Sequence, residues 1–155
     1  TGDCEILVIQ EPENPGDKPG VMKVNSDIAQ MDYRNNYSDF IGRMDLAYAM
    51  ADVVISRSGA STVSELCAAH KAAVFVPSPN VAEDHQTHNA MALVRKDAAM
   101  LVKDAEAPEK LLAAAISLVN DNERLESMQK NIAKLALTNA AGDIAEYAYK
   151  LIEKQ

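Results

Sequence analysis

The sequence predicts an α/β fold, a Rossmann-like parallel sheet with flanking helices, and three observations support this. Short apolar runs rich in β-branched residues alternate with helix-forming segments from residue 43 onward, which is the βαβ rhythm of a parallel sheet. The chain has 155 residues, enough for one domain with one core. Hydrophobic residues make up 48% of it, as in ordinary globular proteins, so wholesale disorder is excluded.

The first third of the chain is irregular apart from one strand. Residues 5–10 are rich in Ile, Leu and Val and predict a short strand. Residues 11–20 contain five prolines and glycines, which exclude a helix or a central strand and predict a loop. Residues 21–36 are polar and predict no definite element, and residues 40–41 are a candidate strand end.

The middle of the chain carries the alternation of strands and helices. Candidate strands lie over residues 52–56, 73–77 and 98–102, and candidate helices lie over residues 43–51, 62–69 and 84–96. The first of these strands contains three consecutive β-branched residues, Val53, Val54 and Ile55, which favour a buried strand. Pro77 ends the second strand because proline cannot donate to a sheet ladder.

The final third of the chain predicts helices. Pro108 stands where a first-turn proline is favourable, and three apolar stripes with helical spacing follow it. The stripes are Leu111, Leu112, Ala115, Ile116 and Val119, then Leu125, Met128, Ile132 and Leu135, then Ile144, Ala148, Leu151 and Ile152. The charged residues between them predict solvated helix faces.

Composition and charge argue against several classes of protein. Fifteen Lys and Arg oppose 23 Asp and Glu, for a net charge of −8, and this acidic balance argues against nucleic-acid binding. No apolar run reaches the roughly 18 to 20 residues of a transmembrane helix, and the start has no signal-peptide pattern. The two cysteines are too few for a disulfide scaffold, and Cys67 is expected to be a small buried apolar residue.

Residues 56–65 follow a candidate strand and open a candidate helix. Ligands of an open parallel sheet bind at the carboxyl ends of its strands, and a helix start there offers N–H groups to a phosphate. Gly59 and Ala60 would let a ligand approach the backbone, and the Glu65 carboxylate suits two ribose hydroxyls. Thr62 and Glu65 also have the spacing of a capping box, in which both satisfy only the helix start. The pattern alone leaves both interpretations open.

A second polar segment, residues 77–90, also leaves a strand and enters a helix. Gln86 and Asn89 are three residues apart, so both amides project from one helical face and suit the hydroxyls of a sugar. His85 and His88 have the same spacing, but no third ligand has a usable spacing. Exposed histidines are therefore expected rather than a zinc site.

The remaining polar residues of these two segments have less specific roles. Asn80, Glu83 and Asp84 favour a helix start. Arg57 is either a functional charge or a structural tether, and the sequence does not decide between the two.

Three ordered segments resemble one known family. Residues 40–48, 51–65 and 76–90 are similar to the carboxyl-terminal domain of the MurG family, the bacterial UDP-N-acetylglucosamine–N-acetylmuramyl-(pentapeptide) pyrophosphoryl-undecaprenol N-acetylglucosaminyltransferases. The resemblance covers the chain from residue 37 or so to the end. It implies one half of a GT-B glycosyltransferase, in which this domain holds the sugar-nucleotide donor and an amino-terminal domain holds the lipid acceptor.

The resemblance implies a binding role for nine residues, Ile41, Ala60, Ser61, Thr62, Val63, Ser64, Glu65, Gln86 and Asn89. The backbone at Ile41 would read the uracil edge, and residues 60–64 would face the donor diphosphate and sugar. Glu65 matches the family's ribose-binding glutamate. Gln86 and Asn89 match the amides that hold the N-acetylglucosamine hydroxyls.

The implied reaction transfers N-acetylglucosamine to a muramyl 4-hydroxyl with inversion, in peptidoglycan synthesis. It needs a base for that hydroxyl and charge stabilisation for the departing UDP. The resemblance places the base in the amino-terminal domain, so no catalytic residue, cofactor or metal is expected in this chain. The expected partners are UDP-N-acetylglucosamine, that amino-terminal domain and, through it, the undecaprenyl-linked acceptor. The implied location is the cytoplasmic face of the bacterial inner membrane, with this part of the enzyme itself soluble.

The sequence departs from the family pattern in two ways. The family's domain opens with a glycine-serine loop that contacts the diphosphate, and the proline-rich residues 11–20 do not replace it. His70 and Ala72 stand where the family usually has Gly and Pro, and Asp97 stands where it usually has Gly. These changes affect turns, so they are expected to lower stability rather than specificity.

Residues 1–36 are therefore interpreted as an irregular or partial amino-terminal segment and residues 37–155 as the donor-binding domain. We expect the chain to be a fragment of such a transferase, inactive alone. Two alternatives remain from the sequence. One is a stand-alone donor-binding subunit of a split glycosyltransferase, and the other is a non-catalytic α/β interaction module.

Overall fold

The computed structural model describes residues 5–10, 20–25, 37–38 and 43–153, with side-chain surroundings for residues 43–153. Six strands form one sheet in the order β3-β2-β1-β4-β5-β6. They are β1 (Glu5–Gln10), β2 (Gly20–Asn25), β3 (Tyr37–Ser38), β4 (Val53–Ser56), β5 (Ala72–Phe75) and β6 (Met100–Leu101). Strands β1, β4, β5 and β6 are parallel to their neighbours in this set, which confirms the predicted Rossmann-like fold class.

The sheet also has an antiparallel part that the sequence did not predict. Strand β2 pairs antiparallel with β1, and β3 pairs antiparallel with β2. The predicted loop over residues 11–20 lies outside the described residues except for Gly20, which begins β2, and the strand end predicted at residues 40–41 also lies outside them. Part of the first 36 residues thus belongs to the sheet, while the domain boundary at residue 37 stays a prediction.

Strands β4 and β5 form the buried centre of the sheet. All four residues of each strand are buried, because helices cover both faces, as parallel sheets require. Side chains of consecutive residues point to opposite faces: Val54 packs into one core cluster, whereas Val53 and Ile55 pack into the other. The β-branched run of β4 is continuous because the strand packs against apolar residues on both of its faces.

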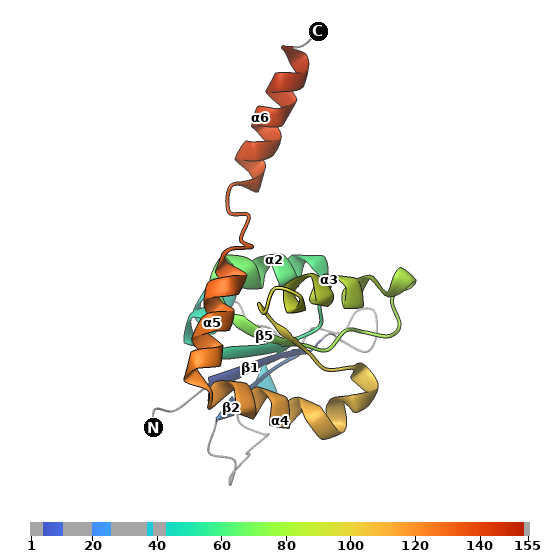
Figure 1. Ribbon diagram of the computed structural model, residues 1–155, viewed down its shortest axis with the longest axis vertical. Coiled ribbons are helices and arrows are strands. Elements are labelled where there is room, and N and C mark those ends of the chain that lie inside the picture. Colours follow the sequence, from blue (N-terminus) through green and yellow to red (C-terminus); the bar gives the residue numbers. More distant parts are fainter. Residues whose placement is uncertain (1–4, 11–19, 26–36, 39–42, 154–155) are drawn as a thin grey trace.

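Helices α1 (Met44–Met50), α2 (Ala60–Ala69) and α3 (His85–Val94) share one core cluster, and α4 (Ala107–Val119) belongs to the other. Figure 1 shows α2 and α3 on one side of the sheet and α4 on the opposite side. Helix α5 (Asn122–Ala133) contacts both layers: Met128 packs with α4, and Ile132 packs in the cluster of α2 and α3. Two short 3-10 helices, Ala82–Asp84 and Asp104–Glu106, precede α3 and α4.

The predicted helices and strands of the middle and final thirds are all present, with shifted ends. Helix α2 begins two residues earlier than predicted, and α3 ends at Val94 rather than at residue 96. The strand predicted over residues 98–102 is shorter, as β6 spans Met100–Leu101. Pro108 lies in the first turn of α4, as predicted.

Two turns adopt a backbone conformation that favours glycine. His70 ends α2 with φ 56° and ψ 37°, and Asp97 follows α3 with φ 50°. At the first turn, the N–H of Lys71 donates to the carbonyl of Leu66 at 3.1 Å, which is the hydrogen bond that closes a Schellman motif. The left-handed region is costly for residues with a Cβ, so these departures from the family's glycines do affect turns, as expected.

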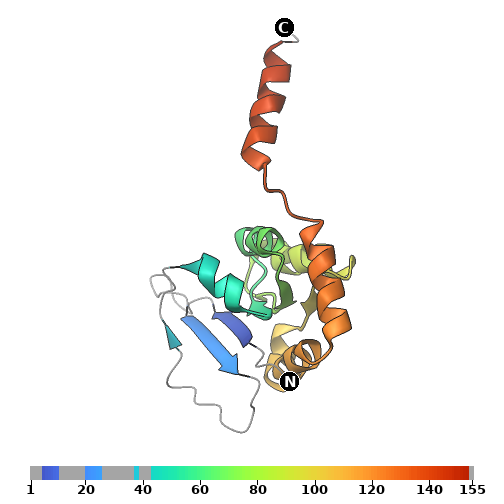
Figure 2. The same cartoon turned by 90° about the vertical axis from the view of Figure 1, so that its left-hand side faces the viewer.

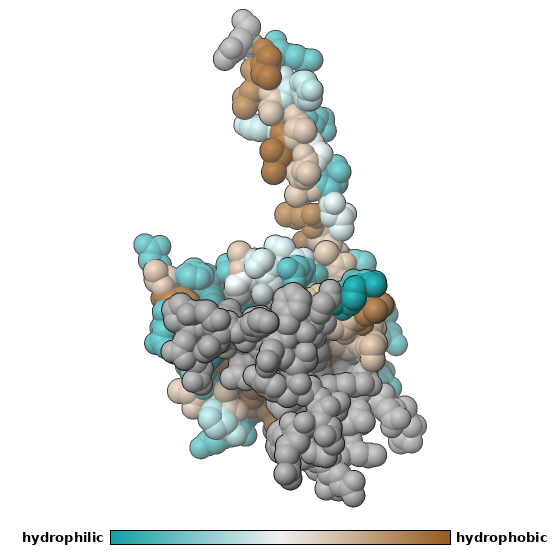
Figure 3. Space-filling model, turned by 180° about the vertical axis from the view of Figure 1, so that it is seen from behind, coloured by the Kyte–Doolittle hydropathy of each residue, from teal (hydrophilic) through white to brown (hydrophobic). Residues whose placement is uncertain are grey.

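Helix α6 (Ala140–Ile152) projects away from the rest of the molecule in two perpendicular views (Figures 1 and 2). None of its residues is buried, so the predicted apolar stripe of Ile144, Ala148, Leu151 and Ile152 is open to solvent. Brown apolar side chains are visible along this helix in Figure 3. Among the described residues, no helix is long and apolar enough to cross a membrane.

Candidate functional site

The candidate site lies at the carboxyl ends of β4 and β5, where the chain enters α2 and α3. The buried polar side chains of the described residues are Ser56, Ser58 and Gln86, and all three belong to this edge. Buried polar groups are normally fixed by hydrogen bonds. Ser58 and Gln86 follow this rule, whereas the buried hydroxyl of Ser56 has no hydrogen-bond partner among the described residues.

The start of α2 overturns the capping-box interpretation. Gly59 is the N-cap residue, and no side chain accepts a hydrogen bond from the first turn. The helix begins at Ala60, so Thr62 lies inside the first turn rather than at the cap position, and Glu65 contacts a different helix. Among the described residues, no side chain caps the first N–H groups of α2, which leaves them available to an anion.

Five consecutive site candidates form the first turn and a half of α2. Ala60, Ser61 and Ser64 are exposed, and Thr62 is half-buried. The hydroxyl of Ser64 donates to the carbonyl of Ala60 at 2.9 Å. Val63 packs against the core cluster of α2 and α3, so its side chain faces inward and only its backbone belongs to the helix start.

Neither the backbone conformation nor the packing of the described residues requires a glycine at position 59. Its φ of −60° and ψ of 152° suit any residue, and a Cβ added there would meet only the hydroxyl oxygen of Thr62, at 3.9 Å. Neither strain nor a clash explains glycine at this position. A small residue at a helix start is instead what close approach of a ligand to the backbone would require.

Glu65 contacts a tyrosine that the sequence analysis did not single out. The hydroxyl of Tyr48, on α1, donates to Oε2 of Glu65 at 3.0 Å. Burial and, to a smaller extent, the negative charge of Glu65 raise the pKa of Tyr48 above its usual value. The two residues are 17 positions apart on different helices, so neither helical spacing nor motif could have joined them.

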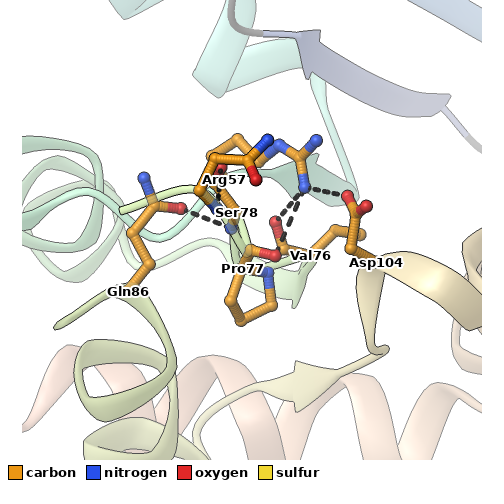
Figure 4. A network of polar contacts seen from close by, with 7 residues as sticks. Arg57, Val76, Pro77, Ser78, Gln86 and Asp104 are labelled. Carbon is orange, nitrogen blue, oxygen red and sulfur yellow. Dashed lines mark hydrogen bonds and ion pairs between the residues drawn. The ribbon is translucent and has the colours of Figure 1, made fainter. Parts of the chain in front are cut away.

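Gln86 is buried at the start of α3 and contacts the strand-to-helix loop. Its Oε1 accepts a hydrogen bond of 2.9 Å from the backbone N–H of Ser78, as Figure 4 shows. Because that partner is a donor, the amide orientation is fixed and the Nε2 group is turned away from Ser78. The backbone carbonyl of Gln86 in turn accepts from the hydroxyl of Ser58 at 2.8 Å.

Asn89 and Gln86 both join α3 to its neighbouring loops. This agrees with the prediction that their amides project from one face of the helix. Nδ2 of Asn89 donates to the carbonyl of Ser58 at 3.0 Å, which leaves Oδ1 as an acceptor without a hydrogen-bond partner among the described residues. The two amides therefore present opposite polarities, a donor from Gln86 and an acceptor from Asn89. His85 and His88 are exposed, as predicted, and a ring nitrogen of His85 lies 2.8 Å from the carbonyl of Ala82.

The structure shows that Arg57 is a tether. Its guanidinium donates to the carbonyl of Val76 at 3.0 Å and to that of Pro77 at 3.3 Å, and it pairs with Asp104 (Figure 4). These contacts fasten the loop after β4 to the end of β5 and to the segment after β6. Its charge is thus already paired within the fold.

The segment before α3 has an unusual backbone. Glu83 and Asp84 both adopt positive φ, 55° and 51°, and Asp84 makes no side-chain cap to α3. Helix α3 does begin directly after Asp84, as predicted, but Asp84 makes no side-chain cap and both residues have left-handed backbone. Strained backbone of this kind is concentrated at functional sites.

Other predicted features contribute less to the described geometry. Ile41 lies outside the described residues, so its role stays a prediction. Cys67 is buried and free, as predicted, and burial raises its pKa. Within residues 43–153, no three His, Cys, Asp or Glu side chains gather in a way that could hold a metal ion.

Comparison with protein families decides the classification. The glycosyltransferase family 28 C-terminal domain matches residues 16–146. The chain belongs to this family. The match begins after β1, extends across β2 and β3, and ends within α6.

Curated relatives support the same assignment. The chain is 53% identical over 118 residues to the UDP-N-acetylglucosamine–N-acetylmuramyl-(pentapeptide) pyrophosphoryl-undecaprenol N-acetylglucosamine transferase of Parabacteroides distasonis, and 54% identical over 118 residues to that of Bacteroides thetaiotaomicron. Each match covers 76% of this chain and 32% of the relative. The chain thus spans about a third of the length of these relatives.

A solved structure agrees with the fold. The crystal structure of Acinetobacter baumannii MurG superposes with a TM-score of 0.62 and 34% identity, over 75% of this chain and 32% of that one. The similarity confirms the GT-B half predicted from the sequence. A second structure, a glycotransferase of kitacinnamycin, has a TM-score of 0.52 at 24% identity and supports the fold alone.

Proposed function

We propose that this domain binds UDP-N-acetylglucosamine as the donor half of an inverting N-acetylglucosaminyltransferase of peptidoglycan synthesis. The observation that carries the proposal is the polar edge at the ends of β4 and β5. There, an uncapped helix start, the exposed Glu65 and the fixed amides of Gln86 and Asn89 occur together. Groups that could contact a diphosphate, the two ribose hydroxyls and a sugar are thereby available at one edge of the sheet.

The order of these groups supports a sugar nucleotide. Glu65 lies beyond the first turn of α2, on the side that contacts α1, and its carboxylate suits ribose hydroxyls. The start of α2 offers N–H groups to a diphosphate. The loop of Ser58 joins that start to the amides of α3. Ribose, diphosphate and sugar would follow one another from α1 to α3, in the order in which the donor is built.

In this proposal, the domain supplies neither the acceptor site nor the base that the transfer reaction needs. The domain holds the donor and stabilises the negative charge of departing UDP through the N–H groups of α2. An amino-terminal domain, as in the longer relatives, would bind the undecaprenyl-linked acceptor at the cytoplasmic face of the inner membrane and provide the base. We therefore assign no catalytic residue to this chain and expect no transfer by it alone.

Titration of the 155-residue chain tests the proposal. Calorimetry or NMR should detect weak binding of UDP-N-acetylglucosamine, with Kd of the order of 1 mM or below. Glu65→Ala should weaken that binding at least tenfold while leaving the circular dichroism spectrum like that of wild type, because Glu65 is exposed and caps nothing. Its thermal midpoint should fall by a few degrees, because the buried hydroxyl of Tyr48 loses its acceptor. Absence of shifts near Glu65 and Gln86 at millimolar ligand would overturn the proposal.

A further inference from the structure

A buried tyrosine contacts the carboxylate that is proposed to bind ribose. Tyr48 is 7% exposed, and its ring packs in the core cluster of α1, α2 and α3. Its hydroxyl reaches out of this cluster to Oε2 of Glu65, at 3.0 Å. Glu65 is exposed, and within the described part of the chain its Oε1 has no hydrogen-bond partner.

Packing alone does not explain a tyrosine here. Phenylalanine would fill the same ring volume, so the hydroxyl is the feature that needs a reason. An exposed glutamate loses side-chain entropy when it is held in one rotamer, and a hydrogen bond from a rigid group supplies that restraint before any ligand arrives. Preorganisation of this kind raises affinity because the ordering cost is not met again on binding.

Helix α1 is itself firmly placed. The Nζ of Lys71 donates to the carbonyl of Ala51 at 3.0 Å and approaches that of Ala49 at 3.4 Å, at the end of α1. The Tyr48 hydroxyl acts as a donor at neutral pH, because the ordinary tyrosine pKa is about 10 and burial raises the pKa of Tyr48 further. The carboxylate of Glu65 thus faces a donor whose position is set by the core.

We propose that Tyr48 is a positioning residue for ribose recognition: it holds Oε2 of Glu65 so that Oε1 faces the ribose hydroxyls of the nucleotide. This inference rests on the proposed function of the site. Tyr48 does not touch the ligand and acts only through Glu65.

The test compares Tyr48→Phe with wild type by calorimetric titration of the 155-residue chain. The probes are UDP and 2′,3′-dideoxy-UDP, which lacks the hydroxyls that Glu65 would bind. Tyr48→Phe should weaken UDP binding about three- to tenfold, the range of a typical net hydrogen-bond contribution, and should leave dideoxy-UDP binding unchanged. Tyr149→Phe, at an exposed position of α6, is the matched control and should bind both ligands like wild type.

A double substitution separates positioning from a general loss of structure. In Glu65→Gln, the added Tyr48→Phe change should weaken UDP binding no further, because the carboxylate that it positions is gone. Equal loss of UDP and dideoxy-UDP binding in Tyr48→Phe, or no loss of either, overturns the inference. Failure of the wild-type chain to bind UDP overturns the proposed function instead, and the positioning role with it.

A second measurement remains decisive if Tyr48→Phe does not fold. Wild-type chain labelled with 3-fluorotyrosine gives a fluorine resonance for Tyr48, identified as the one that shifts in Glu65→Gln. Addition of UDP should move this resonance, since a ribose hydroxyl on Glu65 changes the hydrogen bond to Tyr48. Addition of dideoxy-UDP should not. A resonance that ignores UDP while UDP binds would contradict the positioning role.

Discussion

The side-chain carbonyl of Gln86 accepts a hydrogen bond from the backbone N–H of Ser78 at 2.9 Å. This bond fixes which end of the amide points outward, and Gln86 is only 4% exposed. The residue therefore has two separable roles, one in the loop and one toward a ligand. The acceptor Oε1 serves the fold, and the donor Nε2 is the group that the proposed function assigns to the sugar.

Substitution of Gln86 should separate these roles. Gln86→Glu keeps an acceptor for Ser78, so at neutral pH its free energy of unfolding should fall only by the cost of burying the carboxylate, and this loss should shrink as the pH is lowered. Gln86→Met leaves the N–H of Ser78 without its partner and should lose about 1–2 kcal/mol. In both variants, the ratio of UDP-N-acetylglucosamine affinity to UDP affinity should fall several-fold, because the sugar contact is lost. Denaturant unfolding and calorimetry check the two parts, and an unchanged affinity ratio would contradict the sugar contact.

Gly59→Ser should change stability and binding in opposite directions. Serine is a better N-cap than glycine by a few tenths of a kcal/mol, and a Cβ at this position meets no close neighbour. The free energy of unfolding should therefore rise slightly. Binding of UDP-N-acetylglucosamine should weaken because the side chain occupies the approach to the α2 backbone. If affinity is retained in the stabilised variant, then glycine is not required by a ligand.

Glycine at the two left-handed turns should stabilise the chain. His70→Gly removes a Cβ from an unfavourable conformation and should raise the free energy of unfolding by about 1 kcal/mol. Asp97→Gly should give a smaller gain, about 0.5 kcal/mol, because Asp tolerates this region better. Ala68→Gly, at an exposed position inside α2, is the control and should cost about 1 kcal/mol. Chemical denaturation measures all three, and a loss at His70 would be inconsistent with the turn geometry.

The hydrogen bond of Tyr48 also predicts a pH dependence at alkaline pH. Its pKa is raised in the folded state, whereas in the unfolded chain it is near the ordinary tyrosine value of about 10. The unfolded chain loses this proton first, so the contribution of Tyr48 is fully present below that pH and declines as the pH rises above it. Wild type should therefore lose stability more steeply than Tyr48→Phe above pH 10 or so. Parallel curves for the two proteins would exclude this linkage, since the raised pKa of Cys67 is common to both.

Patterns confined to neighbouring residues predicted most of the fold. The β-branched run of β4 and the stripes of α4 and α5 identify their elements, because burial on known faces dictates residue type. Strand β2 was missed because its partner β1 supplies the pairing. The sequence left the cap of α2 open, because a capping box and a first-turn threonine have the same local sequence. Tertiary contacts decided both.

The candidate site shows the same division. Gln86 and Asn89 share a helical face by spacing alone, and the structure brings both to one edge. Tyr48 and the tether between Arg57 and Asp104 join segments far apart in the chain. No periodicity relates such residues, so only the folded chain places them together.

The final prediction concerns helix α6, whose apolar stripe is exposed in the structure. No residue of α6 is buried, so a chain ending at Thr138 should keep its free energy of unfolding within about 0.5 kcal/mol of the full chain. Ile132→Ala is the control: Ile132 is fully buried in α5, and its loss should cost about 2–4 kcal/mol. Both are measured by urea unfolding. A large loss on removal of α6 would mean that its apolar face packs against the domain in solution.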